Sequence, residues 1–125
     1  MYRTVIAFLL LVVGESVMAH QFTPTYPKLE PSFVKGVVKT EMVLFNSRSD
    51  VRFYELSVHD AEWNDIPFAA ESKVVEVPYL SRKVLNVHIR EKDRNRAVYI
   101  CSKSKLFGNG SNLTMVSSRI CSKIK

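Results

Sequence analysis

Three histidines are the residues of this chain best suited to hold a metal ion: His20, His59 and His88. If the chain is cleaved after Ala19, His20 becomes its first residue, and an N-terminal histidine can chelate copper through its α-amine and one ring nitrogen. His59 and His88 are then candidates for a third ligand, because imidazole suits Cu(II). The alternative is that a histidine falls at the cleavage site by chance and that the chain binds no cofactor.

Carboxylates could complete such a site, with Asp60 or Asp93 as an oxygen ligand. The arrangement resembles that of small periplasmic copper-binding proteins and of lytic polysaccharide monooxygenases. A further group of acidic residues surrounds Trp63 and suggests a carbohydrate or calcium site: Glu55, Asp60, Glu62 and Asp65. Their spacing fits no calcium loop, so we expect exposed turn acids. Trp63 is either a core residue or a surface anchor, and we expect the core because large aromatic side chains usually bury most of their area.

No arrangement of nucleophile, base and oxyanion donor indicates an enzyme. Serine is plentiful, but neither a Gly-x-Ser-x-Gly elbow nor a glycine-rich phosphate loop accompanies it. We therefore expect no catalytic residues and a non-enzymatic protein.

The only two cysteines, Cys101 and Cys121, are expected to form one disulfide bond. Both follow the predicted leader, and an exported domain meets an oxidising environment. Closing a loop of about 20 residues contributes about 3 kcal/mol in the chain-entropy model. The alternative, a metal or redox pair, lacks the close Cys-x-x-Cys spacing of such sites.

Residues 1–19 are predicted to be a signal peptide. Arg3 supplies a positive charge, Val5 to Val13 is an unbroken apolar run, and Ala19 is a small residue at the expected cleavage site. The run has about nine residues, fewer than the roughly 20 of a membrane-spanning helix, although an uncleaved anchor is the alternative. No later stretch is apolar enough to span a membrane. We therefore predict a secreted or periplasmic protein with one domain at residues 20–125.

The formal net charge is +6, and basic residues are concentrated near the end of the chain. These residues are Lys103, Lys105, Arg119, Lys123 and Lys125. Such a surface can attract an anionic partner. Basic and aromatic residues do not interleave as in a nucleic-acid platform, so we expect a solvated exterior and no nucleic-acid partner.

Alternating apolar residues in the segment 37–60 predict two β-strands joined as a hairpin. Thr40, Met42 and Leu44 share one face of the first strand, and Tyr54, Leu56 and Val58 share one face of the second. This period of two is typical of half-buried strands. The polar cluster at residues 46–50 between them predicts a turn.

Later segments repeat this pattern of a short strand and a polar break. Strands are expected near residues 66–68, 73–79, 84–90, 97–101 and 113–124, so that the two cysteines clamp the last two strands. Pro24, Pro27 and Pro31 predict an extended first strand at a sheet edge, broken by a bulge or by a change of sheet. Seven or eight short strands without a helix indicate an all-β fold, an immunoglobulin-like β-sandwich of about seven strands.

The segment from Val43 to Ile89 resembles the N-terminal immunoglobulin-like domain of periplasmic pilus-assembly chaperones. The resemblance rests on Leu44-Phe45-Asn46 at the end of one strand, on Asp65-Ile66-Pro67-Phe68-Ala69, and on a valine-rich strand that ends in a proline. It implies an exported sandwich that holds another protein. In those chaperones the last strand carries a row of bulky apolar residues, whereas here Ser117, Ser118 and Arg119 interrupt that row.

The sequence thus predicts an exported protein that binds another protein or has a structural role, in a pilus, on a cell surface, in a virion or in the periplasm. The partner would contact a loop surface or pair with the proline-rich edge strand. A periplasmic copper-binding protein that uses His20 is the alternative function. The oligomeric state stays open.

Overall fold

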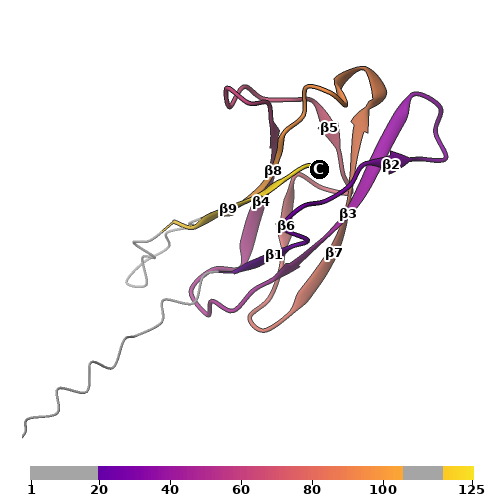
Figure 1. The fold of residues 1–125 in the computed structure, drawn as a ribbon. Coiled ribbons are helices and arrows are strands. Elements are labelled where there is room, and N and C mark those ends of the chain that lie inside the picture. Colours follow the sequence, from indigo (N-terminus) through magenta and orange to yellow (C-terminus); the bar gives the residue numbers. More distant parts are fainter. Residues whose placement is uncertain (1–19, 106–116) are drawn as a thin grey trace, which may run out of the picture.

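The computed structural model describes residues 20–105 and 117–125, and Figure 1 shows their fold. The predicted signal peptide and the start of the last predicted strand lie outside these residues. The described strands are β1 (Gln21–Thr23), β2 (Glu30–Pro31), β3 (Val37–Phe45), β4 (Phe53–His59), β5 (Phe68–Ala69), β6 (Val74–Glu76), β7 (Arg82–Arg90), β8 (Tyr99–Lys105) and β9 (Arg119–Lys123). A single 3-10 turn, η1 (Glu91–Asp93), follows β7. Within the described ranges, no helix is long and apolar enough to cross a membrane.

Two antiparallel sheets form the sandwich and confirm the predicted all-β class. The first sheet has the order β1-β3-β7-β5, with β2 also paired to β3, and the second has the order β6-β4-β8-β9. The predicted hairpin of residues 37–60 is wrong, because β3 lies in the first sheet and β4 in the second. Alternation of apolar residues shows which face of a strand is buried, and both strands bury that face in the same core from opposite sides.

The core lies between the sheets, where the alternating residues meet. Met42 and Leu44 of β3 are fully buried, and Tyr54 of β4 faces them from the second sheet. Leu85, Val87 and Ile89 of β7 are buried as the pattern predicts. β3 and β7 are paired along their whole lengths, from Val37 opposite Arg90 to Phe45 opposite Arg82, so this pair is the centre of the first sheet.

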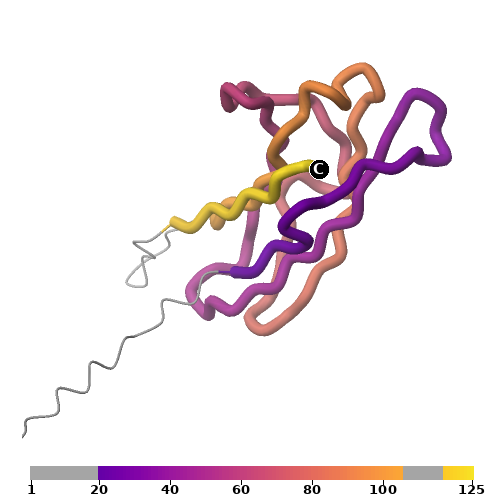
Figure 2. The backbone as a smooth tube through the Cα atoms, viewed as in Figure 1, coloured from indigo at the N-terminus to yellow at the C-terminus, as the bar shows by residue number. Residues whose placement is uncertain are grey.

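The proline-rich segment joins the two sheets. It starts in the first sheet as β1, continues through a cis Thr23–Pro24 bond, and then lies beside the end of the chain in the second sheet, as the tube in Figure 2 shows. There the carbonyls of Thr25 and Pro27 accept hydrogen bonds from the amides of Lys123 and Lys125, at 3.0 and 2.9 Å. The segment returns to the first sheet as β2. The prolines thus divide the predicted first strand in two, because proline can accept a ladder hydrogen bond but cannot donate one.

Asn46 holds the crossing from β3 to β4. Its side chain is completely buried. The side-chain nitrogen donates to the carbonyls of Val51 and Val77, at 2.7 and 2.8 Å. The side-chain oxygen accepts from the Arg48 amide and from the Tyr54 hydroxyl. One side chain therefore ties the crossing loop to the β6–β7 connection and to β4.

Candidate functional site

The outer edge of β9 is the candidate functional site, because β9 is the last strand of the second sheet. Ile124 donates its amide to Val98 and Ser118 accepts from Ser104, so the even-numbered residues turn their backbone groups toward β8. The odd-numbered residues therefore turn theirs away. The proline-rich segment covers this edge at Lys123 and Lys125. β1 lies beside β9 but pairs with β3, so no described strand is hydrogen-bonded to this edge at Arg119 and Cys121.

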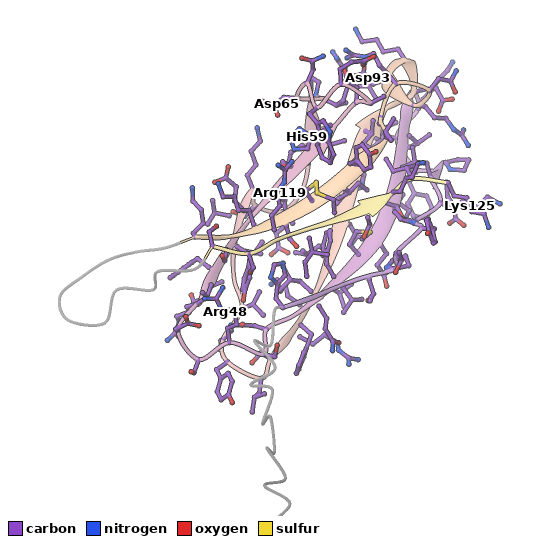
Figure 3. All side chains as sticks on the ribbon, turned by 60° about the vertical axis from the view of Figure 1, so that its left-hand side comes forward. Arg48, His59, Asp65, Asp93, Arg119 and Lys125 are labelled. Carbon is purple, nitrogen blue, oxygen red and sulfur yellow. A yellow bond between two sulfur atoms is a disulfide. The ribbon has the colours of Figure 1, made fainter. Side chains whose placement is uncertain are left out.

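A disulfide and basic side chains lie on the face of the second sheet that points away from the core. Cys101 of β8 and Cys121 of β9 are directly opposite each other and form the disulfide, with 4.0 Å between their Cα atoms. Arg119 extends beside this bond, as Figure 3 shows, with its Nη2 atom 3.7 Å from the Cys101 sulfur. Lys103 lies opposite Arg119 in the ladder. The open edge thus has a cationic outer side, fixed by a covalent bond to β8.

Trp63 lies above this face and not in the core, so the sequence-based expectation for it is wrong. Its side chain is 49% exposed. The Trp63 and Tyr99 rings are stacked, with centroids 4.3 Å apart and planes 2° from parallel. The Arg119 guanidinium lies 5.0 Å from the Trp63 ring. Trp63, Tyr99 and Arg119 therefore form one aromatic and cationic cluster beside the open edge.

The loop that carries Trp63 is held in an unusual conformation. Trp63 has a φ of 66°, in the left-handed region that side chains other than glycine rarely adopt. The Asp60 carboxylate accepts hydrogen bonds from the amides of Glu62 and Asn64, at 3.0 and 2.9 Å. Burial acts to raise the pKa of Asp60, but these hydrogen bonds hold it below its usual value. Asp60 therefore orders the turn that places Trp63 on Tyr99.

Glycine at position 63 is expected to give a more stable protein than alanine, by about 1 kcal/mol, because glycine adopts a positive φ without steric cost. Both variants lose the same ring contacts. Urea unfolding followed by circular dichroism measures the difference. Val84 of β7 is equally exposed at 49% and provides the control, since alanine should be the better replacement on an ordinary strand. If alanine were the more stable replacement at position 63 as well as at position 84, backbone strain at Trp63 would be refuted.

His20, the residue that the expected cleavage would place first, is buried between β1, β8 and the start of β9. The His20 ring is 1% exposed. Its Nε2 atom lies 2.7 Å from the Ser102 hydroxyl and its Nδ1 atom 3.0 Å from the Ser118 hydroxyl. Burial lowers the pKa of His20 to about 4, while the hydrogen bond to Ser102 acts to raise it and nearby Arg48 to lower it. His20 therefore fastens β1 to β8 and to the start of β9 as a neutral side chain.

The structure does not bring the three histidines together. His59 lies on β4, with its Nδ1 atom 3.2 Å from Asp65, and His88 lies on β7 in the other sheet. Among the residues that the structure describes, no group of three histidine, cysteine or acidic side chains is placed to hold a metal. These residues do not assemble the expected copper site, and copper binding stays an untested prediction.

The proposed oxygen ligands have structural partners instead. Asp60 orders the Trp63 loop through its hydrogen bonds to backbone amides. Asp93 is buried, and its carboxylate pairs with Arg90 and Arg96 at 2.7 and 2.9 Å. The hydrogen bonds from these two arginines keep the pKa of Asp93 below its usual value. Both carboxylates thus fix turns at one end of the sandwich.

Sequence reasoning missed the buried polar contacts around His20. Ser102 and Ser104 alternate along β8 and are buried, and the Ser104 hydroxyl accepts the amide of Ser118 at 2.8 Å. Serines at inward positions of a strand could have indicated these contacts, because a buried hydroxyl group needs a hydrogen-bond partner. Ser118, one of the residues that interrupt the apolar row of the last strand, is therefore explained by its contacts with Ser104 and His20.

The two antiparallel sheets form an immunoglobulin-like β-sandwich, and the comparison with solved structures confirms the expected resemblance in fold to a chaperone. The solved structure of the E. coli chaperone DraB is similar, with a TM-score of 0.62 and 12% sequence identity. The match covers 85% of this chain and 53% of DraB, so the chain spans about half the length of that protein. No protein-family model and no curated protein matches the sequence. At this identity the likeness shows the fold alone.

Proposed function

We propose that this protein is an exported, non-enzymatic binding protein that takes an extended segment of a partner protein onto the outer edge of β9. The observation that carries the proposal is the edge of β9 at Arg119 and Cys121, where no described strand pairs, beside the cationic side chains of the outer face. An edge of this kind is a template for an added strand. The likeness to DraB, described as a chaperone, supports a role in holding another protein.

The proline-rich segment already uses the same edge in the way that a partner would. The Thr25 carbonyl accepts a hydrogen bond from the Lys123 amide, and the Pro27 carbonyl accepts one from the Lys125 amide. Because the residue numbers increase in the same direction along both segments, the pairing is parallel. This contact ends before Cys121. An added segment would therefore extend this pairing toward Arg119 and would enter between β9 and the neighbouring β1.

Export to the periplasm or beyond is supported by the disulfide and by the predicted leader, because disulfides persist in oxidising compartments. The disulfide also fixes β9 against β8 at the position where the partner would bind. The partner thus meets a strand that is already held in place, which lowers the ordering cost of binding.

The open edge predicts a pattern of amide hydrogen exchange. In the free protein the amides of Arg119 and Cys121 should exchange at least tenfold faster than those of Ile120 and Ser122, which face β8. Exchange measured residue by residue by NMR tests this. Slow exchange at Arg119 and Cys121 in the free protein would show that the edge is already covered and would overturn the proposal.

Two variants of one residue test the role of this edge in binding. Arg119→Pro removes the outward amide and leaves the ladder to β8 intact, whereas Arg119→Ala keeps the amide and removes the charge. A photo-crosslinker at position 119 first identifies the partner in the exported fraction, and calorimetry with the purified partner follows. Arg119→Pro should weaken binding at least tenfold, and Arg119→Ala less. Equal affinities for the two variants would exclude backbone pairing at this position.

A further inference from the structure

The turn between β2 and β3 exposes two large apolar side chains at one end of the sandwich. Phe33 is fully exposed, at 102% of its reference area, and Val34 is 62% exposed. The turn is ordered: the Ser32 hydroxyl donates to the Val34 carbonyl at 3.0 Å, and the Ser32 amide donates to Val37 at 3.1 Å. Gly36 supplies the positive φ of 80° that closes it. The backbone thus holds both apolar side chains in solvent.

A basic loop lies beside this turn. The amide of Glu91 donates to the carbonyl of Gly36 at 2.8 Å, so the turn and the β7–β8 connection touch, as the neighbouring ribbons in Figure 1 show. We call residues 32–36 and 90–96 together the apolar tip. Its basic residues outnumber its acidic ones by five to two: Lys35, Arg90, Lys92, Arg94 and Arg96 against Glu91 and Asp93.

The acidic residues of the apolar tip are already neutralised. Asp93 pairs with Arg90 and Arg96, and Glu91 lies 3.5 Å from Arg94. Lys35 and Lys92 are exposed and form no ion pair with the described residues. A further cation, Lys39, lies 5.3 Å from the Phe33 ring centroid. The tip therefore presents an apolar apex surrounded by uncompensated positive charge.

We propose that the apolar tip binds an anionic lipid surface, with Phe33 and Val34 in the interface and Lys35 and Lys92 facing lipid phosphates. An aromatic and an aliphatic side chain flanked by lysines match the apolar and anionic layers of such a surface. Phe33 projects fully into solvent, whereas a protein hot spot is typically a packed pocket that receives an anchor. Two apolar side chains and a small excess of charge give weak, reversible binding that salt screens.

Vesicle binding by the exported, disulfide-bonded protein tests this proposal. Sedimentation with vesicles of equal phosphatidylglycerol and phosphatidylcholine should show binding at low salt, and vesicles of phosphatidylcholine alone should bind at least tenfold more weakly. Phe33→Ser should lower the partition coefficient at least tenfold. Tyr79→Ser is the matched control, because Tyr79 is 54% exposed in the turn at the opposite end and should have no effect. Equal losses in the two variants, or no binding to anionic vesicles, would overturn the proposal.

A pair of charge reversals separates the apolar tip from general attraction by a basic protein. Lys92→Glu should weaken binding to the anionic vesicles several-fold, while Lys103→Glu on the outer face of the second sheet should not. Equal effects of the two variants would show that only the net charge of the protein attracts it to the vesicles.

Fluorescence can report insertion of the apolar tip directly, because Trp63 is the single tryptophan. Phe33→Trp in a Trp63→Phe background should shift its emission to the blue on vesicles, and an unchanged spectrum would refute insertion of the tip.

Discussion

Replacement of Asn46 by alanine is expected to lower the free energy of unfolding by about 4 kcal/mol. The variant leaves four buried groups without their partner: the carbonyls of Val51 and Val77, the amide of Arg48 and the hydroxyl of Tyr54. Each such group costs about 1–3 kcal/mol when buried and unpaired. Because small domains are stable by only about 5–15 kcal/mol, this loss is a large part of the total free energy of unfolding.

Urea unfolding with the disulfide intact measures this loss. Asn86→Ala provides the matched control, because Asn86 is exposed on β7 and its replacement should change stability by less than about 0.5 kcal/mol. Tyr54→Phe should be destabilising in the wild-type protein but neutral in the Asn46→Ala background, where the hydroxyl has already lost its acceptor. A loss below about 1 kcal/mol for Asn46→Ala would show that the crossing loop does not depend on this side chain.

Acidification from pH 7 to pH 4 is expected to cost about 3 kcal/mol of stability through His20 alone. Burial lowers the pKa of His20 from 6.5 to about 4 in the folded protein, so the unfolded chain binds more protons between these values. Stability therefore falls as the pH drops from 6.5 to about 4, and this contribution is complete below that range. Above pH 6.5 the side chain is neutral in both states and has no effect.

The variant His20→Gln isolates this contribution, because glutamine can bond to Ser102 and Ser118 but does not titrate in this range. Its stability should depend less on pH than that of the wild-type protein, and the two curves should converge toward about pH 4. Asn86→Ala is the control and should keep the wild-type slope, since it changes an exposed side chain on β7 that does not titrate. Parallel curves for His20→Gln and the wild-type protein would refute a buried, neutral His20.

The faces of the strands were predictable from the sequence, and their assignment to sheets was not. The alternation in β3, β4 and β7 correctly identifies the side chains that enter the core, because the period of two is a property of each strand by itself. Which strands pair depends on contacts between residues far apart in the chain. Asn46 illustrates this limit, since its type indicates a turn, while its buried partner Val77 lies 31 residues away.

The candidate site was less predictable than the fold. The last strand was placed correctly beside β8, but its open edge follows from the position of β9 at the end of the sheet. Trp63 was expected inside because of its size, and the hydrogen bonds of Asp60 place it outside in a left-handed conformation. The histidines were selected by type, and the structure distributes them over separate parts of the sandwich.

The pairing of Thr25 with Lys123 has a consequence for when this chain can fold. Strand contacts between residues far apart in the sequence raise the contact order, and proteins with a high contact order fold slowly. During synthesis the segment around Thr25 must wait for Lys123 before this part of the second sheet can form. Until β9 follows, β8 has an unpaired edge, which exposes that strand to wrong pairing while the chain is being made.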